Sequence, residues 1–110
     1  MVIRVVVAED NYLLREGMTR LLSTANDVEV VAVCGEFDEL LSLAVTHVPD
    51  VVITDIRMPP TGTDEGIRAA AKLRHTQPQI GVVVLSQYAT PSYALALFED
   101  GSDGRAYLLK

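Results

Sequence analysis

The stretch Val51-Val52-Ile53-Thr54-Asp55 decides how this chain folds. Its run of β-branched residues predicts a short strand that is buried on both faces. Pro49 precedes the run and disfavours a helix that leads straight into it. The run ends in a carboxylate, at the place where open α/β sheets hold their ligands. Because Asp also commonly caps helices and begins turns, the meaning of Asp55 depends on which other residues reach the same edge.

The rest of the chain alternates predicted strands with predicted helices. Apolar runs predict four further strands, at residues 3–8, 28–34, 80–86 and 106–109. Apolar residues at helical spacing predict helices at residues 14–25, 37–47, 64–76 and 93–100, the third of them with Thr63 as its N-cap. This alternation indicates an α/β fold with a parallel sheet and right-handed crossovers.

The composition fits one small domain that spans residues 1–110. Hydrophobic residues make up 49% of the chain, which is enough for a single core. No apolar run approaches the ~20 residues of a membrane span and no secretory leader is evident, so we expect a cytoplasmic protein without a membrane partner. Cys34 is the only cysteine, which excludes an internal disulfide. The net charge of −6 and the lack of a basic face disfavour direct binding of nucleic acid.

Several polar side chains follow the predicted strands at the edge where the carboxyl ends meet. They are Glu9, Asp10, Asp55, Ser86 and Lys110. Three carboxylates in one crevice repel one another, and ligands that are all oxygen favour Mg²⁺ as the cation that offsets this repulsion. A lysine and a hydroxyl group can both bind the oxygens of a phosphoryl group. A carboxylate surrounded by Mg²⁺, a lysine and a serine can act as a nucleophile toward phosphorus. Each of these residues alone is more simply explained as a helix cap or a turn residue. Their convergence at one edge of the sheet favours a functional site.

Four stretches of the sequence together form a specific combination. They are Val7 to Asn11, Pro49 to Pro59, Val84 to Ser86 and Tyr107 to Lys110. With this combination the chain resembles, over its whole length, the receiver domain of two-component response regulators. It is most similar to the receivers attached to LuxR/NarL-type helix-turn-helix domains.

The resemblance implies a flavodoxin-like, doubly wound sheet of five parallel strands in the order 2-1-3-4-5. The family's fifth helix would come after Lys110, so we expect a single receiver domain that is truncated before its last helix. Without that helix, part of one sheet face would be open to water, and we expect self-association or reduced stability. The residues open to water would come from Val51, Ile53, Val82, Val84, Ala106 and Leu108 or their alternating neighbours.

The resemblance also implies a phosphoacceptor and a metal site. Asp55 would accept a phosphoryl group from a sensor histidine kinase. Glu9 and Asp10 would hold Mg²⁺ together with Asp55 and the backbone carbonyl of Arg57. The chain would then be a signalling switch, and its only catalysis would be its own phosphorylation and dephosphorylation.

Three further residues have roles that the resemblance implies. Ser86 and Lys110 would contact the phosphoryl oxygens, and Tyr107 would be the aromatic residue that changes rotamer on activation. The LuxR/NarL likeness implies a C-terminal helix-turn-helix DNA-binding domain in the full-length protein, and hence a role in transcription regulation.

The sequence departs from the usual receiver pattern beside Asp55. Gly66 lies eleven residues after Asp55, whereas many receivers have a glycine about three residues sooner. The segment 60–64 is therefore expected to form a longer loop beside the site. Arg57 and Tyr88 occupy positions that tune dephosphorylation in the family, and both are bulky.

Other functions remain as alternatives. A haloacid-dehalogenase-like phosphohydrolase also uses an Asp nucleophile, but it places a second Asp where this chain has Arg57, which cannot donate a proton at neutral pH. A nucleotide-binding module would need a glycine-rich phosphate motif that is missing here. A receiver-like binding module that is not phosphorylated usually lacks the acids or the lysine. His47 and His75 lack a partner at metal-ligand spacing and are interpreted as surface residues.

Overall fold

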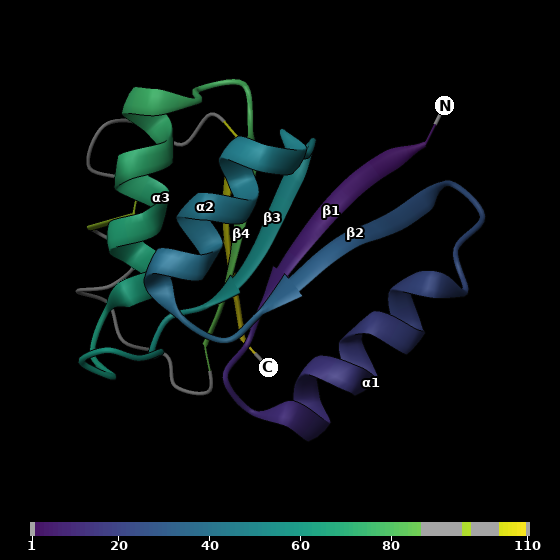
Figure 1. The fold of residues 1–110 in the computed structure, drawn as a ribbon, viewed down its shortest axis with the longest axis horizontal. Coiled ribbons are helices and arrows are strands. Elements are labelled where there is room, and N and C mark those ends of the chain that lie inside the picture. Colours follow the sequence, from purple (N-terminus) through teal and green to yellow (C-terminus); the bar gives the residue numbers. More distant parts are fainter. Residues whose placement is uncertain (1, 87–95, 98–103, 110) are drawn as a thin grey trace.

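The computed structural model describes residues 2–86, 96–97 and 104–109 of the 110-residue chain. Five parallel strands form one sheet in the order β2-β1-β3-β4-β5, which confirms the predicted flavodoxin-like topology (Figure 1). The elements are β1 (Ile3–Ala8), α1 (Tyr12–Ser23), β2 (Val28–Cys34), α2 (Phe37–His47), β3 (Val51–Asp55), α3 (Glu65–Thr76), β4 (Gly81–Ser86) and β5 (Arg105–Leu109). The predicted fourth helix, at 93–100, lies mostly outside the described residues.

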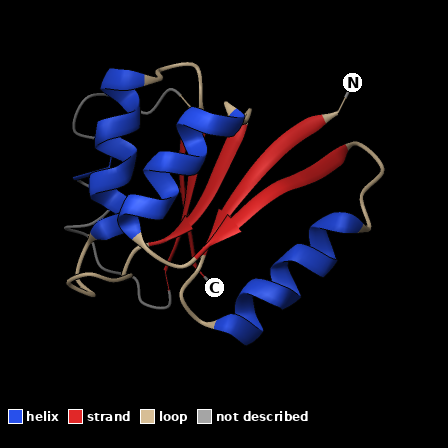
Figure 2. Ribbon diagram, in the orientation of Figure 1, coloured by secondary structure: helices blue, strands red, loops and turns tan. Residues whose placement is uncertain are grey.

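The helices lie on both faces of the sheet. Helices α2 and α3 cover one face and α1 lies on the other (Figures 1 and 2). The main core forms under α2 and α3, where alternate strand residues are fully buried against Leu40 and Leu73. These strand residues are Val6, Ala8, Val52, Val82 and Val84. None of the helices in the described ranges has the length and hydropathy that a membrane crossing requires.

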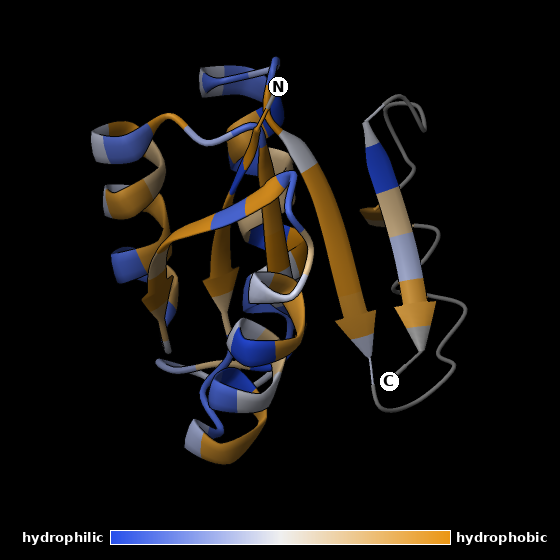
Figure 3. Cartoon of the chain, turned by 90° about the vertical axis from the view of Figure 1, so that its right-hand side faces the viewer, coloured by the Kyte–Doolittle hydropathy of each residue, from blue (hydrophilic) through white to orange (hydrophobic). Residues whose placement is uncertain are grey.

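The opposite face is covered less completely. Helix α1 packs against β1 and β2, and the strand residues Val51 and Val83 on this face are only partly buried. Figure 3, viewed from the α1 side, shows β5 at the edge of the sheet, where Leu108 is 52% exposed. An apolar hollow of about 250 Å³ lies here, lined by residues that include Val51, Val83 and Ala106.

The prediction left open which alternating set of strand residues lies on the α1 face, and β4 shows which set it is. Val82 and Val84 are buried beneath α2 and α3, and their neighbours Val83 and Leu85 occupy the α1 face instead. Because the apolar run of β4 is continuous, its sequence has no alternation that would assign one residue to each face.

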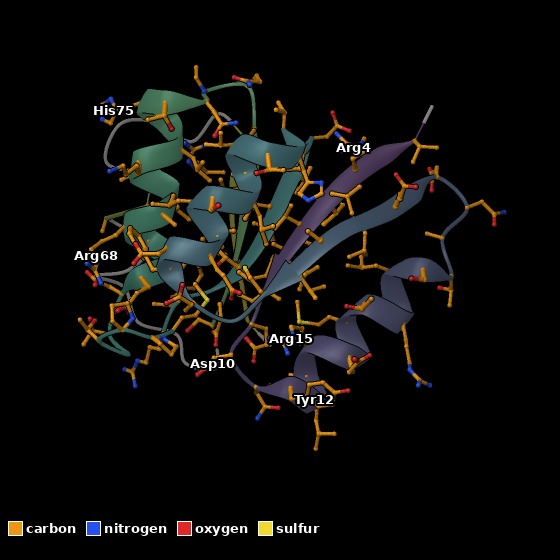
Figure 4. All side chains as sticks on the ribbon, viewed as in Figure 1. Arg4, Asp10, Tyr12, Arg15, Arg68 and His75 are labelled. Atoms are coloured by element: carbon orange, nitrogen blue, oxygen red, sulfur yellow. The ribbon has the colours of Figure 1, made fainter. Side chains whose placement is uncertain are left out.

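The C-terminus of α2 ends in a strained residue. Val48 adopts a left-handed conformation, with φ 42° and ψ 64°, which β-branched residues rarely tolerate. The Arg4 guanidinium donates to the carbonyls of His47 and Val48, at 2.6 and 3.2 Å, and so neutralises the end of the helix. Figure 4 shows Arg4 beside this end of α2.

Replacing Val48 by glycine is expected to stabilise the fold by about 1 kcal/mol, because glycine adopts this conformation without a Cβ clash. The Val48 side chain is 49% exposed, so little burial is lost. Urea denaturation measures the change. Val45→Gly is the matched control, since Val45 is 69% exposed but lies inside the helix, and this variant should be less stable.

Helix α3 begins differently from the prediction. The N-cap is Asp64, one residue after the predicted Thr63, and its side chain makes no capping hydrogen bond. Glu65 is the first helical residue, and its carboxylate is fully buried. The carboxylate accepts hydrogen bonds from the amide of Thr61 at 2.6 Å and from the amide of Thr63 at 3.0 Å. Thus the loop that precedes α3 is held by an acid from the helix itself.

Burial raises the pKa of the Glu65 carboxyl, but hydrogen bonds from the Thr61 hydroxyl and from backbone amides outweigh it and lower the pKa from 4.5 to about 2. A lowered pKa stabilises the fold above pH 4.5, and this contribution is lost as the pH falls from 4.5 toward 2.

We therefore expect Glu65→Gln to be less stable than the native chain at neutral pH, with the difference shrinking as the pH falls below about 4.5. Urea melts across this pH range measure the two free energies of unfolding. Asp64→Asn serves as the control, because Asp64 is partly exposed. A difference that does not depend on pH would contradict a lowered pKa at Glu65.

Candidate functional site

The registers of the central strands bring the predicted acids to one edge of the sheet. Ala8 of β1 pairs with Thr54 of β3, so the next residues, Glu9 and Asp55, leave the sheet at the same level. Asp55 in turn pairs with Leu85 of β4, directly before Ser86. The sheet topology therefore places the ends of three neighbouring strands beside one another.

Three carboxylates meet at this edge. One oxygen each of Glu9, Asp10 and Asp55 lies within 4.8 Å of the other two. Glu9 is 1% exposed, Asp10 is exposed, and Asp55 is partly buried, so the cluster opens to solvent on one side. The donor set is all oxygen with no histidine or cysteine, and it fits a hard divalent cation such as Mg²⁺. The sequence prediction that these three acids converge is thus matched by their geometry.

The backbone around the acids is held by nearby hydrogen bonds. The amide of Glu9 donates to the carbonyl of Cys34 at 3.0 Å. At Asp55, one carboxylate oxygen accepts the amide of Ile56 at 3.0 Å, and the carbonyl accepts the Thr54 hydroxyl at 2.9 Å. These bonds fix the backbone positions of Glu9 and Asp55, and hence how closely their two carboxylates approach each other.

Arg15 is a neighbour of the site that the sequence analysis missed. Its guanidinium donates to the Glu9 carbonyl at 3.4 Å, and it lies over the Tyr12 ring at 5.6 Å from the centroid. Figure 4 shows Arg15 close to Asp10, both near the first turn of α1. The sequence feature that could have indicated Arg15 is its position one helical turn after the N-cap Asn11.

Only some of the other predicted site residues lie within the part of the chain that the structure describes. Ser86 ends β4 and is 6% exposed, while the exposed Arg57 follows Asp55 by two residues. Tyr107 lies in β5 and packs, partly buried, against the main core. Lys110 lies outside the described residues, although Leu109 directly before it pairs with Ser86. Tyr88 also lies outside them.

Gly66, in the first turn of α3, lies close to the site. Its amide donates to the carbonyl of Ile56 at 2.8 Å. A Cβ at this position would overlap the Asp55 carbonyl oxygen, so only glycine fits without a backbone shift. Although Gly66 comes late in the sequence after a longer loop, it lies directly against the backbone of Asp55.

Comparison with known proteins gives a consistent family assignment. The model of the response regulator receiver domain matches residues 5–110. The oxygen regulatory protein NreC of Staphylococcus haemolyticus is 31% identical over 97% of this chain and 48% of its own length. The chain therefore spans about half the length of the curated relatives it matches.

Two solved structures are similar in both fold and sequence. The receiver domain of the response regulator NarL from Mycobacterium tuberculosis has a TM-score of 0.86 and 34% identity, covering 98% of this chain and 83% of that one. A DNA-binding response regulator of the LuxR family from Staphylococcus aureus has a TM-score of 0.84 and 28% identity, covering 98% and 86%. Since the family match and these relatives extend over nearly the whole sequence, this chain belongs to the response regulator receiver domain family, of the LuxR/NarL type.

Proposed function

We propose that this chain is a phosphoacceptor switch that takes a phosphoryl group from a sensor histidine kinase onto Asp55. The observation that carries the proposal is the convergence of Asp55 with Glu9 and Asp10 at the carboxyl edge of the sheet. Three carboxylates this close cost electrostatic free energy in the unliganded fold, and both a divalent cation and the chemistry of a phosphoryl group offset that cost.

In this proposal Glu9, Asp10, Asp55 and the carbonyl of Arg57 hold Mg²⁺. When bound, the ion neutralises negative charge that gathers on the phosphoryl oxygens during transfer. An Asp55 carboxylate oxygen attacks phosphorus, the bond from phosphorus to the donor histidine nitrogen breaks, and its electron pair leaves with the imidazole. The hydrogen bond from the Ile56 amide orients the attacking carboxylate.

In this proposal, residues at the ends of β4 and β5 respond to phosphorylation. Ser86 donates its hydroxyl to a phosphoryl oxygen, and Lys110 pairs with another. Tyr107 changes rotamer when Ser86 moves toward the phosphoryl group. The partial burial of Tyr107 against the core is compatible with a side chain that has two packed positions.

The proposed partners follow from the family and from the length of the relatives. A sensor histidine kinase supplies the phosphoryl group in the cytoplasm. A C-terminal helix-turn-helix domain in the full-length protein binds DNA, whereas this acidic chain, with a net charge of −6, does not bind it directly. The partly open α1 face is compatible with a homodimer or other self-association.

Asp55→Asn is expected to abolish phosphorylation, because the amide is not a nucleophile toward phosphorus. Incubation with acetyl phosphate and Mg²⁺, followed by intact mass, detects the added phosphoryl group. Asp27→Asn is the matched control: Asp27 is exposed in the turn before β2, far along the sheet from the acids, and this variant should be modified normally. A phosphoryl group retained in Asp55→Asn would sink the assignment.

Mg²⁺ is expected to raise the melting temperature by a few degrees, as a ligand does when it binds only the folded state. The comparison is between chelator and millimolar Mg²⁺ in a thermal melt followed by circular dichroism. Asp10→Ala should lose most of this response, and Asp27→Ala should keep it. Equal melting temperatures with and without Mg²⁺ in the native chain would argue against the metal site.

A further inference from the structure

We propose that Glu65 is a positioning residue for the chemistry at Asp55, an inference that rests on the proposed function. Its buried carboxylate fastens the β3–α3 loop, residues 56–64, to the first turn of α3. Through that turn it holds the backbone of the phosphoacceptor. The proposal concerns the part of the chain that departs from the usual receiver pattern, where the loop is longer.

Both oxygens of the Glu65 carboxylate are engaged by the loop. Oε1 accepts the amide of Thr63 at 3.0 Å. Oε2 accepts the amide of Thr61 at 2.6 Å and the Thr61 hydroxyl at 2.5 Å. Arg68 Nη2, one helical turn later, lies 3.0 Å from Oε2 and completes the set of donors. A carboxylate that accepts this many hydrogen bonds in a buried place has one orientation, so the loop that donates them has one as well.

The next residue carries this constraint to Asp55. Gly66 is buried, donates to the Ile56 carbonyl at 2.8 Å, and lacks the Cβ that would overlap the Asp55 carbonyl oxygen. The first turn of α3 therefore lies in direct contact with the backbone that bears the nucleophile. Any displacement of Glu65 is transmitted to the backbone of Asp55, because the atoms between them are closely packed.

A second set of contacts, at the N-terminus of α2, holds the loop at Pro59. Arg68, which pairs with Glu65, lies over the Phe37 ring at 5.3 Å from the centroid. The Phe37 amide donates to the Pro59 carbonyl at 3.1 Å, and Figure 4 shows Arg68 beside this end of α2 and α3. Arg57, whose carbonyl is the proposed fourth metal ligand, is two residues before Pro59. Arg57 thus lies between two anchored residues, Ile56, whose carbonyl accepts the Gly66 amide, and Pro59, whose carbonyl accepts the Phe37 amide.

The longer loop explains why such an anchor is needed. A few extra residues add little to the entropy of closing a loop, but they add many alternative conformations beside the acids. Thr61 and Thr63, which supply the donors, belong to the lengthened segment itself. Glu65 selects one of these conformations and so preorganises the metal-binding loop before Mg²⁺ arrives.

The test compares three variants of the purified chain. Glu65→Gln keeps the shape of the side chain and removes its charge. Thr61→Val removes one hydroxyl donor and leaves the backbone amide. Asp64→Asn is the matched control, because Asp64 is the adjacent acid and also pairs with Arg68, but its side chain is 42% exposed and makes no capping hydrogen bond.

Two quantities are measured at a temperature where circular dichroism shows each variant to be folded. One is the rate constant for phosphorylation by acetyl phosphate as a function of Mg²⁺ concentration, and the other is the Mg²⁺ affinity by calorimetry. We expect Glu65→Gln to lower the rate constant or the affinity at least about tenfold, the range typical of residues that orient metal ligands. Thr61→Val should change the same quantity less, and Asp64→Asn less than about twofold.

These readouts separate positioning from stability. A purely structural role lowers the fraction of folded molecules but leaves the rate constant and affinity of the folded ones unchanged. Because the Thr61 hydroxyl acts through its hydrogen bond to Glu65, the double variant should react no more slowly than Glu65→Gln alone. Should Glu65→Gln fail to fold, Thr61→Val, at an exposed residue, decides the question by itself.

The outcomes also distinguish this proposal from the one on which it rests. If the native chain is phosphorylated and Glu65→Gln behaves like Asp64→Asn, the positioning role is overturned and the phosphoacceptor assignment stands. If the native chain takes no phosphoryl group, the proposed function fails, and the Mg²⁺ affinities alone then decide the role of Glu65. Equal affinities in the native chain and Glu65→Gln would in that case overturn it.

Discussion

The register between β1 and β3 is the constraint on which the site depends. Ala8 pairs with Thr54, and the acids Glu9 and Asp55 follow at the same level. Since strand side chains alternate between faces, a slip of one residue would turn Thr54 out of the core and Asp55 into it. The burial of Thr54, Val52 and Val6 beneath α2 and α3 therefore fixes the reactive edge from within the core.

Two kinds of carboxylate lie close together around this edge, and their surroundings give them opposite properties. Glu9, Asp10 and Asp55 face one another and gain from a cation. Glu65 instead faces amides and a hydroxyl, which hold its pKa at about 2, and the Arg68 guanidinium lies 3.0 Å from its Oε2. The first group is suited to binding and reaction, because a cation relieves the repulsion among its three carboxylates. The second is suited to holding structure, because its charge is already compensated by the chain.

Much of the fold and part of the site were predictable from the sequence, because they depend on local patterns. Apolar runs marked the five strands, and the parallel topology then required Glu9, Asp10 and Asp55 to meet. Which alternating set of β4 residues lies on the α1 face was left open, since a continuous apolar run has no alternation that would decide it. The burial of Glu65 and the approach of Arg15 were also missed. Both depend on contacts between elements, which residue spacing along one helix does not reveal.

The enclosure of Glu65 also constrains how the β3–α3 loop is able to change in evolution. Deleting the segment that contains Thr61 and Thr63 would leave a buried carboxylate with Arg68 but without its donors from the loop, which is a costly defect for a small domain. Replacing Glu65 first would leave the amides of the loop without an acceptor. Loop length and the acid at position 65 are therefore expected to be gained or lost together, so that relatives of this chain divide into two discrete lineages rather than a graded series.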